Sequence, residues 1–270
     1  MKVAFQGEHG AYSEEAALRY LGAVETLPSA TFANALDSVG RDHAQRAIIP
    51  VENSTEGSVG EANDAIRAKR GVLHIVGETY LHVKHCLVGN TDDISRIGTI
   101  YSHPQALGQC RRFVSGYRTI PTHDTAGSVR IIAEDGSDSV AGIASRQAAE
   151  HYNRTVISDD ISDIKHNYTR FVVLERRGAS PQEGSDKISV TFTLPHRPGS
   201  LHRALEMLLP VNLTRIESRP DRTGRWSYVF FADFVGGAGT LDTVIDGLRG
   251  ECATLDVLGS YRAAPFELSP

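Results

Sequence analysis

The chain has 270 residues, and at roughly 150 residues per domain this length predicts about two domains. Hydrophobic residues make up 40% of the chain and charged residues 23%, a composition that argues against disorder, a coiled coil or a collagen-like repeat. The formal net charge is −5, which leaves no basic excess to neutralise phosphates, so we expect no nucleic-acid partner.

Neither export nor membrane insertion is predicted. The apolar run at 3–5 is far shorter than a signal-peptide core of roughly 7–15 residues, and no stretch approaches the roughly 18–20 apolar residues that span a bilayer. The cysteines Cys86, Cys110 and Cys252 are odd in number and far apart, which argues against a disulfide framework or a cysteine zinc site. We therefore expect a reduced, cytoplasmic protein without membrane contact.

The first 175 residues alternate short apolar runs with amphipathic stretches. The predicted strands are 2–6, 46–50, two within 72–88, 97–102, 117–121, 139–143 and 171–175. The predicted helices are 14–21 with Ser13 as N-cap, 31–39, 62–69, 104–114, 128–134 with a cap near 124–125, and 146–152. This alternation favours an α/β fold with parallel sheets covered by helices.

A polar segment at 176–187, with glycine, serine and proline, predicts a linker. Beyond it, strands are expected at 188–194, 212–218, 227–234 and 253–261, and helices at 200–209 and 241–248. The resulting order, βαββαβ, is ferredoxin-like.

Small polar residues and glycine occupy four predicted junctions between strands and helices. These are 7–13 (GEHGAYS), 52–58 (ENSTEGS), 102–105 (SHPQ) and 124–128 (DTAGS). In open α/β sheets, ligands bind where strands end and helices begin, and the first N–H groups of a helix attract anions. Together the junctions predict a cleft for a small anion, although each alone is also typical of ordinary caps and turns.

Metal and nucleotide motifs are absent from the sequence. His82 and His85 are three residues apart on a predicted strand, which places them on opposite faces and prevents a shared metal. The sequence also lacks HExxH, GxGxxG, a P-loop and GxSxG. We therefore expect no metal site.

The segment 167–171 (NYTRF) carries the strongest chemical signal. In an extended chain Asn167 and Thr169 face one side and Arg170 faces the other. Arg170 could clamp a carboxylate of a ligand or pair with an acidic residue of the protein. His103 could act as a general acid or base, or cap the helix that follows it.

At these residues the chain resembles prephenate dehydratases that carry a C-terminal ACT regulatory domain. Segments that match in the first part are 3–17, 49–59, 101–110, 124–129, 141–152 and 167–174. Segments that match in the second part are 195–205, 211–220 and 226–234. NxTRF, PVENS and ESRP in one chain make the resemblance specific.

The resemblance implies a catalytic domain at 1–180 with two lobes like those of periplasmic binding proteins. Lobe one would hold 1–80 and 165–180, lobe two 81–164, and a ferredoxin-like ACT domain would hold 187–264. The implied activity is the conversion of prephenate to phenylpyruvate in phenylalanine biosynthesis, without a cofactor. The implied effector is phenylalanine, which binds a homodimer or homotetramer and inhibits it.

The reaction loses carbon dioxide and hydroxide, and hydroxide is a poor leaving group that needs a proton donor. The resemblance assigns this catalytic role to Thr169, which we interpret as a hydrogen-bond donor to the departing oxygen. A relay through Glu52, His103 or water stays open. The residues expected to bind the substrate, besides the 7–13 turn, are Asn53, Ser54, Thr125, Asn167, Arg170 and Phe171, with Glu52, Ser102 and His103 in support.

The expected phenylalanine site lies in the second part of the chain. A glycine before a helix allows close approach to free N–H groups that could hold a carboxylate, and Glu217 could hold an ammonium group. The expected residues are Gly199, Ser200, Leu201, Asn212, Leu213, Glu217, Ser218, Arg219 and Pro220.

Two other functions stay open. Arogenate carries an amine where prephenate has a ketone, so a carboxylate in the pocket would favour an arogenate dehydratase. A non-catalytic cytoplasmic sensor of amino acids would have no need of Thr169 in its NYTRF context.

Overall fold

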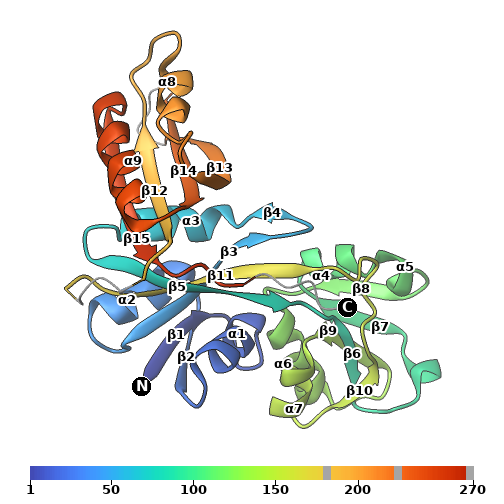
Figure 1. The fold of residues 1–270 in the computed structure, drawn as a ribbon. Coiled ribbons are helices and arrows are strands. Elements are labelled where there is room, and N and C mark those ends of the chain that lie inside the picture. Colours follow the sequence, from blue (N-terminus) through green and yellow to red (C-terminus); the bar gives the residue numbers. More distant parts are fainter. Residues whose placement is uncertain (179–183, 222–226, 266–270) are drawn as a thin grey trace. The chain divides into compact units, whose positions relative to one another are not determined.

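The computed structural model describes residues 1–178, 184–221 and 227–265 (Figure 1). They form two compact units: unit 1 holds Met1–Ala62 and Thr79–Phe171, and unit 2 holds Asn63–Glu78 and the described residues from Val172 onward. No helix among the described residues is both long enough and apolar enough to cross a membrane. These compact units do not test the domain limits predicted from the sequence, which stay a prediction.

The first sheet of unit 1 contains parallel strands. β1 (Lys2–Gln6) lies between β2 (Glu25–Ser29) and β3 (Arg46–Asn53) and pairs parallel with both. α1 (Tyr12–Leu21) and α2 (Phe32–Gly40) pack on these strands. Strands covered by helices need apolar residues on consecutive positions, which is why the central residues of β1 and β3 are buried. β2 was not predicted, because its sequence ETLPS lacks an apolar run.

The second sheet of unit 1 is mixed. Its order is β10 (Thr155–Ser158), β6 (Cys86–Gly89), β9 (Val140–Ala144), β7 (Thr99–Ser102) and β8 (Arg118–Pro121). β7 pairs parallel with β8 and β9, whereas β6 pairs antiparallel with β9 and β10. The expected parallel pairing therefore holds for β7, β8 and β9 but not for β6 and β10, and β10 was not predicted. Antiparallel strands beside a parallel core are common in α/β sheets.

Helix starts in unit 1 differ from two of the predictions. α1 begins after Ala11, which offers no side-chain cap, so the prediction of Ser13 as N-cap is wrong. The Glu14 carboxylate instead accepts the Gly10 N–H at 2.6 Å and the Thr26 hydroxyl at 2.6 Å. The single helix expected at 104–114 is divided at Cys110 into α4 (Pro104–Gln109) and α5 (Arg111–Val114).

The remaining helices of the second sheet have side-chain caps, of which the one at Asp124 was predicted and the one at Ser145 was not. α6 (Thr125–Asp135) begins at Asp124, whose carboxylate accepts the Gly127 N–H at 2.6 Å. α7 (Arg146–His151) begins after Ser145, whose hydroxyl accepts the Ala148 N–H. Short polar side chains at these positions satisfy backbone donors that would otherwise lack partners.

Unit 2 has the predicted βαββαβ order, which the structure confirms. Its elements are β12 (Lys187–Thr193), α8 (Ser200–Glu206), β13 (Asn212–Pro220), β14 (Tyr228–Val235), α9 (Ala238–Glu251) and β15 (Thr254–Tyr261). The strand order is β13-β14-β12-β15, and β15 pairs with β5 (Leu73–His82). Ile188, Val190 and Phe192 of β12 form a core with residues of α8 and α9. α3 (Gly60–Ala68) and β11 (Tyr168–Arg176), like β5, contribute residues to both units.

A buried ion pair lies in unit 2. Lys187 of β12 donates to both carboxylate oxygens of Glu78 at 2.9 Å, and the two side chains are 4% and 1% exposed. The Ala264 N–H donates to the same carboxylate at 3.1 Å. The pair therefore connects β5, β12 and the end of the described chain.

Glu78→Ala should lower the free energy of unfolding by about 3–5 kcal/mol, because it leaves the Lys187 ammonium buried without its carboxylate. The matched control is Asp246→Ala, which breaks an exposed pair with Arg249 and should cost less than about 1 kcal/mol. Urea unfolding of the full chain measures both values. Equal losses in the two variants would contradict a structural role for the buried pair.

Candidate functional site

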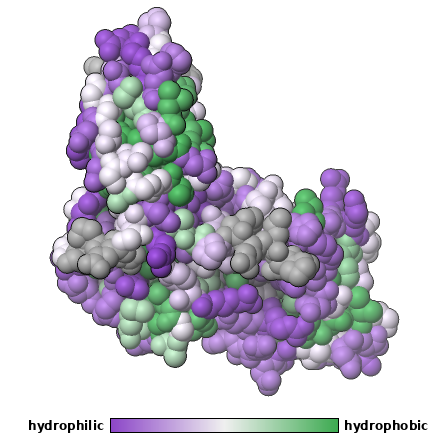
Figure 2. All heavy atoms as spheres, in the orientation of Figure 1, coloured by the Kyte–Doolittle hydropathy of each residue, from purple (hydrophilic) through white to green (hydrophobic). Residues whose placement is uncertain are grey.

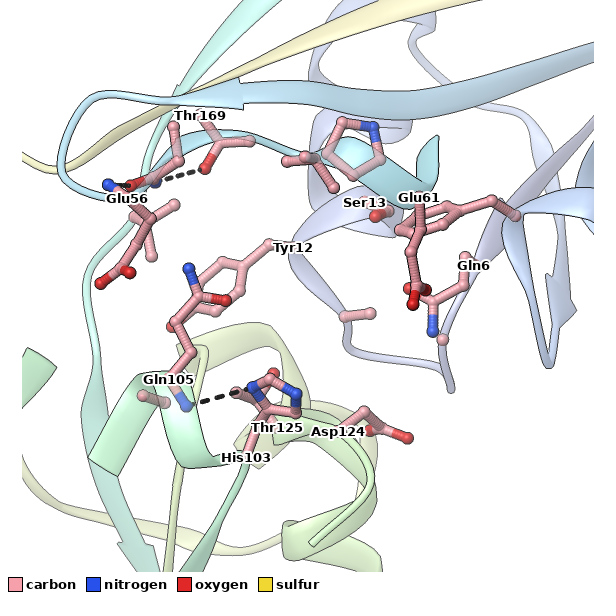
Figure 3. A pocket seen from close by; sticks show the side chains of 18 of the residues that line it. Gln6, Tyr12, Ser13, Glu56, Glu61, His103, Gln105, Asp124, Thr125 and Thr169 are labelled. Carbon is pink, nitrogen blue, oxygen red and sulfur yellow. Dashed lines mark hydrogen bonds between the residues drawn. The ribbon is translucent and has the colours of Figure 1, made fainter. Parts of the chain in front are cut away.

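A pocket of about 580 Å³ lies in unit 1, and several helices begin at its wall (Figure 3). Tyr12 of α1, Phe32 of α2, Gly60 of α3 and Thr125 of α6 are first residues of their helices and line it. The N-terminus of a helix carries unpaired N–H groups and a partial positive charge. The backbone therefore favours an anionic ligand here, as the four junctions predicted.

The charged side chains of the pocket are negative, in contrast to the partial positive charge of the helix N-termini. Among the described residues that line it, none is lysine or arginine, and the carboxylates are Glu56, Glu61 and Asp124. The other titratable side chains of the described wall are Tyr12, His85, His103 and His123. Burial lowers the pKa of His103, and the nearby Asp124 carboxylate partly offsets this. Attraction for an anion in this pocket therefore has to come from the helix ends and not from lysine or arginine side chains.

The Thr169 hydroxyl is held by an amide from a neighbouring strand. Asn53, at the end of β3, donates its Nδ2 to Thr169 Oγ1 at 3.0 Å and to Asn167 Oδ1 at 2.7 Å. Asn167 and Thr169 therefore face the same side, as the extended pattern predicted. Because Thr169 Oγ1 accepts a hydrogen bond from Asn53, its own proton is available to a ligand in the pocket.

The turn after Asn53 is tied to the start of β11. The Ser54 hydroxyl accepts the Tyr168 N–H at 2.9 Å and donates to the His166 carbonyl at 3.2 Å. The Ser54 N–H donates to the Tyr168 carbonyl at 2.8 Å. These bonds hold Asn53 and Thr169 next to each other although 116 positions separate them in the sequence.

Besides Gly7, Ala11, Tyr12 and Ser13 of the expected turn, five of the individually expected residues line the pocket: Asn53, His103, Thr125, Thr169 and Phe171. Figure 3 shows Thr169 on one side and His103 and Thr125 on the other. His103 Nδ1 accepts the Gln105 N–H at 3.3 Å, so His103 caps α4.

Other expected residues lie behind this wall. Arg170 is 5% exposed and pairs with Glu52 at 3.4 Å, the internal pairing that the sequence left open. Ser102 is fully buried and donates to the Ile143 carbonyl at 2.7 Å, which joins β7 to β9. Neither side chain lines the pocket, so their roles toward a substrate stay a prediction.

Several lining residues were not predicted individually, among them Gln6, Glu56, Glu61, Gln105 and Gln109. Tyr12 was included only through the 7–13 turn, and His85 only as a rejected metal ligand. Gln109 lies on the last turn of α4, beyond the SHPQ junction, and no short motif marks it. His82 lies apart from His85, stacks on Tyr168 and bonds the Lys165 carbonyl. No cluster of three metal-ligating residues occurs among the described positions.

The residues expected to bind phenylalanine lie in unit 2. Gly199 has φ 79° and precedes α8, where Ser200 is buried. Arg219, on β13, donates to both carboxylate oxygens of Asp64 at 3.1 Å and to Glu217 at 3.3 Å. Arg219 of the expected site is thus engaged with α3, whereas Glu217 pairs with Arg215 and Arg219 on β13 itself.

The prephenate dehydratase family model matches residues 3–179. The chain belongs to the prephenate dehydratase family. An arogenate dehydratase/prephenate dehydratase 2 of Arabidopsis thaliana is 38% identical, over 97% of this chain and 72% of that protein.

Solved structures agree with this membership in fold. A prephenate dehydratase from Arthrobacter aurescens, crystallised with L-Phe, superposes with a TM-score of 0.87 at 31% identity and covers 97% of this chain and 90% of that one. GqqA, described as a novel type of quorum quenching acylase, superposes with a TM-score of 0.89 at 30% identity and covers 98% of this chain and 99% of that one.

Proposed function

We propose that this chain converts prephenate to phenylpyruvate, carbon dioxide and water, with Thr169 as the catalytic residue. The observation that carries the proposal is the Asn53 amide, which donates to Thr169 Oγ1 and leaves the hydroxyl proton for the substrate. Helix N-termini around the same pocket supply attraction for the two substrate carboxylates.

The pocket suits a reaction in which one carboxylate leaves as neutral carbon dioxide. The bond from the ring to that carboxylate breaks, its electron pair enters the aromatic ring, and the C–O bond on the opposite carbon breaks. A fixed cation at the departing carboxylate would stabilise the substrate more than the transition state and would slow this step. The described lining without lysine or arginine avoids that penalty.

The departing oxygen leaves as water once it has a proton, and Thr169 stabilises it by donating a hydrogen bond. A threonine hydroxyl is a weak acid, so the proton is replaced from water or a side chain. That His103 lines the same pocket supports this role for it, whereas Glu52 is paired with Arg170.

The structural similarity to GqqA does not lead us to propose an acylase activity for this chain. Hydroxyl nucleophiles in acyl transfer are activated by a base within hydrogen-bond reach. The hydrogen bond found for Thr169 comes from the Asn53 amide, which is not a base. An N-acyl substrate included in the first assays would test this directly.

Thr169→Ala should lower kcat for prephenate by about 100-fold or more, the loss typical of a missing proton-transfer group. Thr169→Ser keeps the hydroxyl and should retain most of the activity. Formation of phenylpyruvate, read by its absorbance in alkali, measures both. Thr243→Ala, an exposed threonine of α9, is the control, and full activity in Thr169→Ala would refute the assignment.

Arogenate is a second candidate substrate, because the carboxylates of Glu56 and Glu61 line the pocket and could pair with its ammonium group. Glu61→Gln should lower kcat/KM for arogenate about fivefold relative to prephenate, the size of a solvent-exposed ion pair. Parallel assays of phenylalanine and phenylpyruvate formation measure the ratio, with Glu206→Gln on α8 as control. An unchanged ratio would exclude Glu61 from substrate choice.

We further propose that residues 187–264 form an ACT domain that binds phenylalanine in a homodimer or homotetramer. The βαββαβ order and a relative crystallised with L-Phe support this. Hydrophobic residues gather on the surface of unit 2 in Figure 2. Among the exposed large side chains of this unit are Ile216 of β13 at 44% and Tyr228 of β14 at 46%. Such a surface suits contact with a second copy. The cytoplasmic location stays a prediction.

Glu217→Gln should raise the phenylalanine concentration for half-inhibition about tenfold, because the ammonium group of the effector loses a charged hydrogen-bond partner. The kcat without phenylalanine should change less than about twofold, since Glu217 does not line the pocket. Titration of activity with phenylalanine measures this, with Asp246→Asn on α9 as control. Unaltered inhibition would remove Glu217 from the effector site.

A further inference from the structure

His85 has no role in the chemistry proposed above, yet it is placed at the centre of the pocket's hydrogen bonds. It lies between β5 and β6, is 3% exposed and lines the pocket. Its Nδ1 lies 2.8 Å from the Tyr12 hydroxyl, and its Nε2 lies 2.8 Å from Gln109 Oε1. The ring thus joins the first residue of α1 to the last residue of α4.

The direction of these hydrogen bonds is set at Asn53. Its Oδ1 accepts the backbone N–H groups of Thr55 at 2.9 Å and Glu56 at 3.0 Å, and a backbone N–H can only donate. The other end of the Asn53 amide is therefore the NH₂ group, which donates to Asn167 Oδ1 at 2.7 Å.

The orientation of the Asn53 amide also fixes the orientations of the Asn167 and Gln109 amides. Since Asn167 presents its oxygen to Asn53, its NH₂ group donates to Gln109 Oε1 at 3.0 Å. The NH₂ group of Gln109 in turn donates to Thr55 Oγ1 and Glu56 Oε1, both at 3.2 Å. Gln109 thereby fastens α4 to the turn that positions Asn53.

The Gln109 oxygen then decides the state of His85. An acceptor faces Nε2, so Nε2 carries the proton, and in the neutral ring Nδ1 is left to accept from the Tyr12 hydroxyl. Burial lowers the pKa of His85 and raises that of Tyr12, which keeps both groups uncharged. The Tyr12 hydroxyl also donates to the Lys84 carbonyl at 3.0 Å, so its single proton is shared between that carbonyl and His85 Nδ1.

We propose that His85 is a positioning residue of the dehydratase: the Gln109 oxygen selects the ring tautomer with the proton on Nε2, and this N–H in turn holds the Gln109 oxygen in place. Without that N–H the Gln109 oxygen keeps only the bond from Asn167, and a reversed Gln109 amide would set its NH₂ group against that of Asn167. The fastening of α4 to the Asn53 turn would loosen, and with it the placement of Thr169. The kinetic part of this inference rests on the proposed function.

Two variants of His85 separate positioning from simple folding. In His85→Gln the new amide nitrogen takes the place of Nε2 and can still donate to Gln109, whereas in His85→Asn it is too short to reach. We expect His85→Asn to lower kcat for prephenate about tenfold with KM within about threefold, the size of one lost buried hydrogen bond. His85→Gln should keep at least about half of kcat, and His202→Asn, an exposed control on α8, should match wild type.

A double-mutant cycle shows whether His85 acts through Gln109. In the Gln109→Ala background, His85→Asn should cause no further loss of kcat, because the bond that it removes is already gone. Additive losses would overturn the proposal, since they would mean that His85 acts on the substrate or the fold directly. Equal losses in His85→Asn and His85→Gln, or full kcat in His85→Asn, would overturn it as well.

The tautomer can be read without any substrate. Nitrogen-15 spectra of histidine-labelled wild-type protein near neutral pH, assigned with His85→Gln, should show a protonated Nε2 and a bare Nδ1 for His85. Tyr12→Phe should move the Nδ1 signal toward that of an unbonded nitrogen. A protonated Nδ1 in wild type would overturn the proposal even if the variants fail to fold. Absence of prephenate turnover in wild type would instead count against the proposed function and leave this spectrum informative.

Discussion

The amide of Asn53 is the constraint on which the pocket depends. Two backbone N–H groups fix its oxygen, so its NH₂ group must face Asn167 and Thr169. An amide turned the other way would place two donors against each other and leave a buried oxygen without a partner, a costly arrangement at low dielectric. As a consequence, Thr169 Oγ1 already accepts a hydrogen bond from Asn53, and the hydroxyl proton of Thr169 can be donated to a ligand.

The electrostatics of the pocket follow from where helices begin. Partial charges at helix ends attract an anion without the strong, localised stabilisation that a guanidinium would give. Decarboxylation benefits from that difference, because the charge on the departing carboxylate disappears in the reaction. The carboxylates of Glu56 and Glu61 could also bind a positive group. Arogenate has such a group, an ammonium, where prephenate has a ketone.

In unit 2, one buried and one partly exposed ion pair join strands of the second part of the chain to earlier segments. Lys187 pairs with Glu78 on β5, and Arg219 pairs with Asp64 on α3. Segments from the first part of the sequence thus supply counter-charges for strands of the second part. Any effector that uses Arg219 must compete with a carboxylate already bound there, so effector binding and the state of α3 are coupled.

The sequence by itself determined the family, the βαββαβ order of the second part and the helix cap at Asp124, because each depends on residues close together in the chain. It also determined that Asn167 and Thr169 share a face, since an extended backbone alternates its sides. Only the tertiary structure decided that Arg170 pairs with Glu52, that Ser102 is buried, and that Gln109 reaches the Asn53 turn. These contacts join positions more than fifty residues apart or depend on burial, and a local pattern carries no information about which distant group will be the partner.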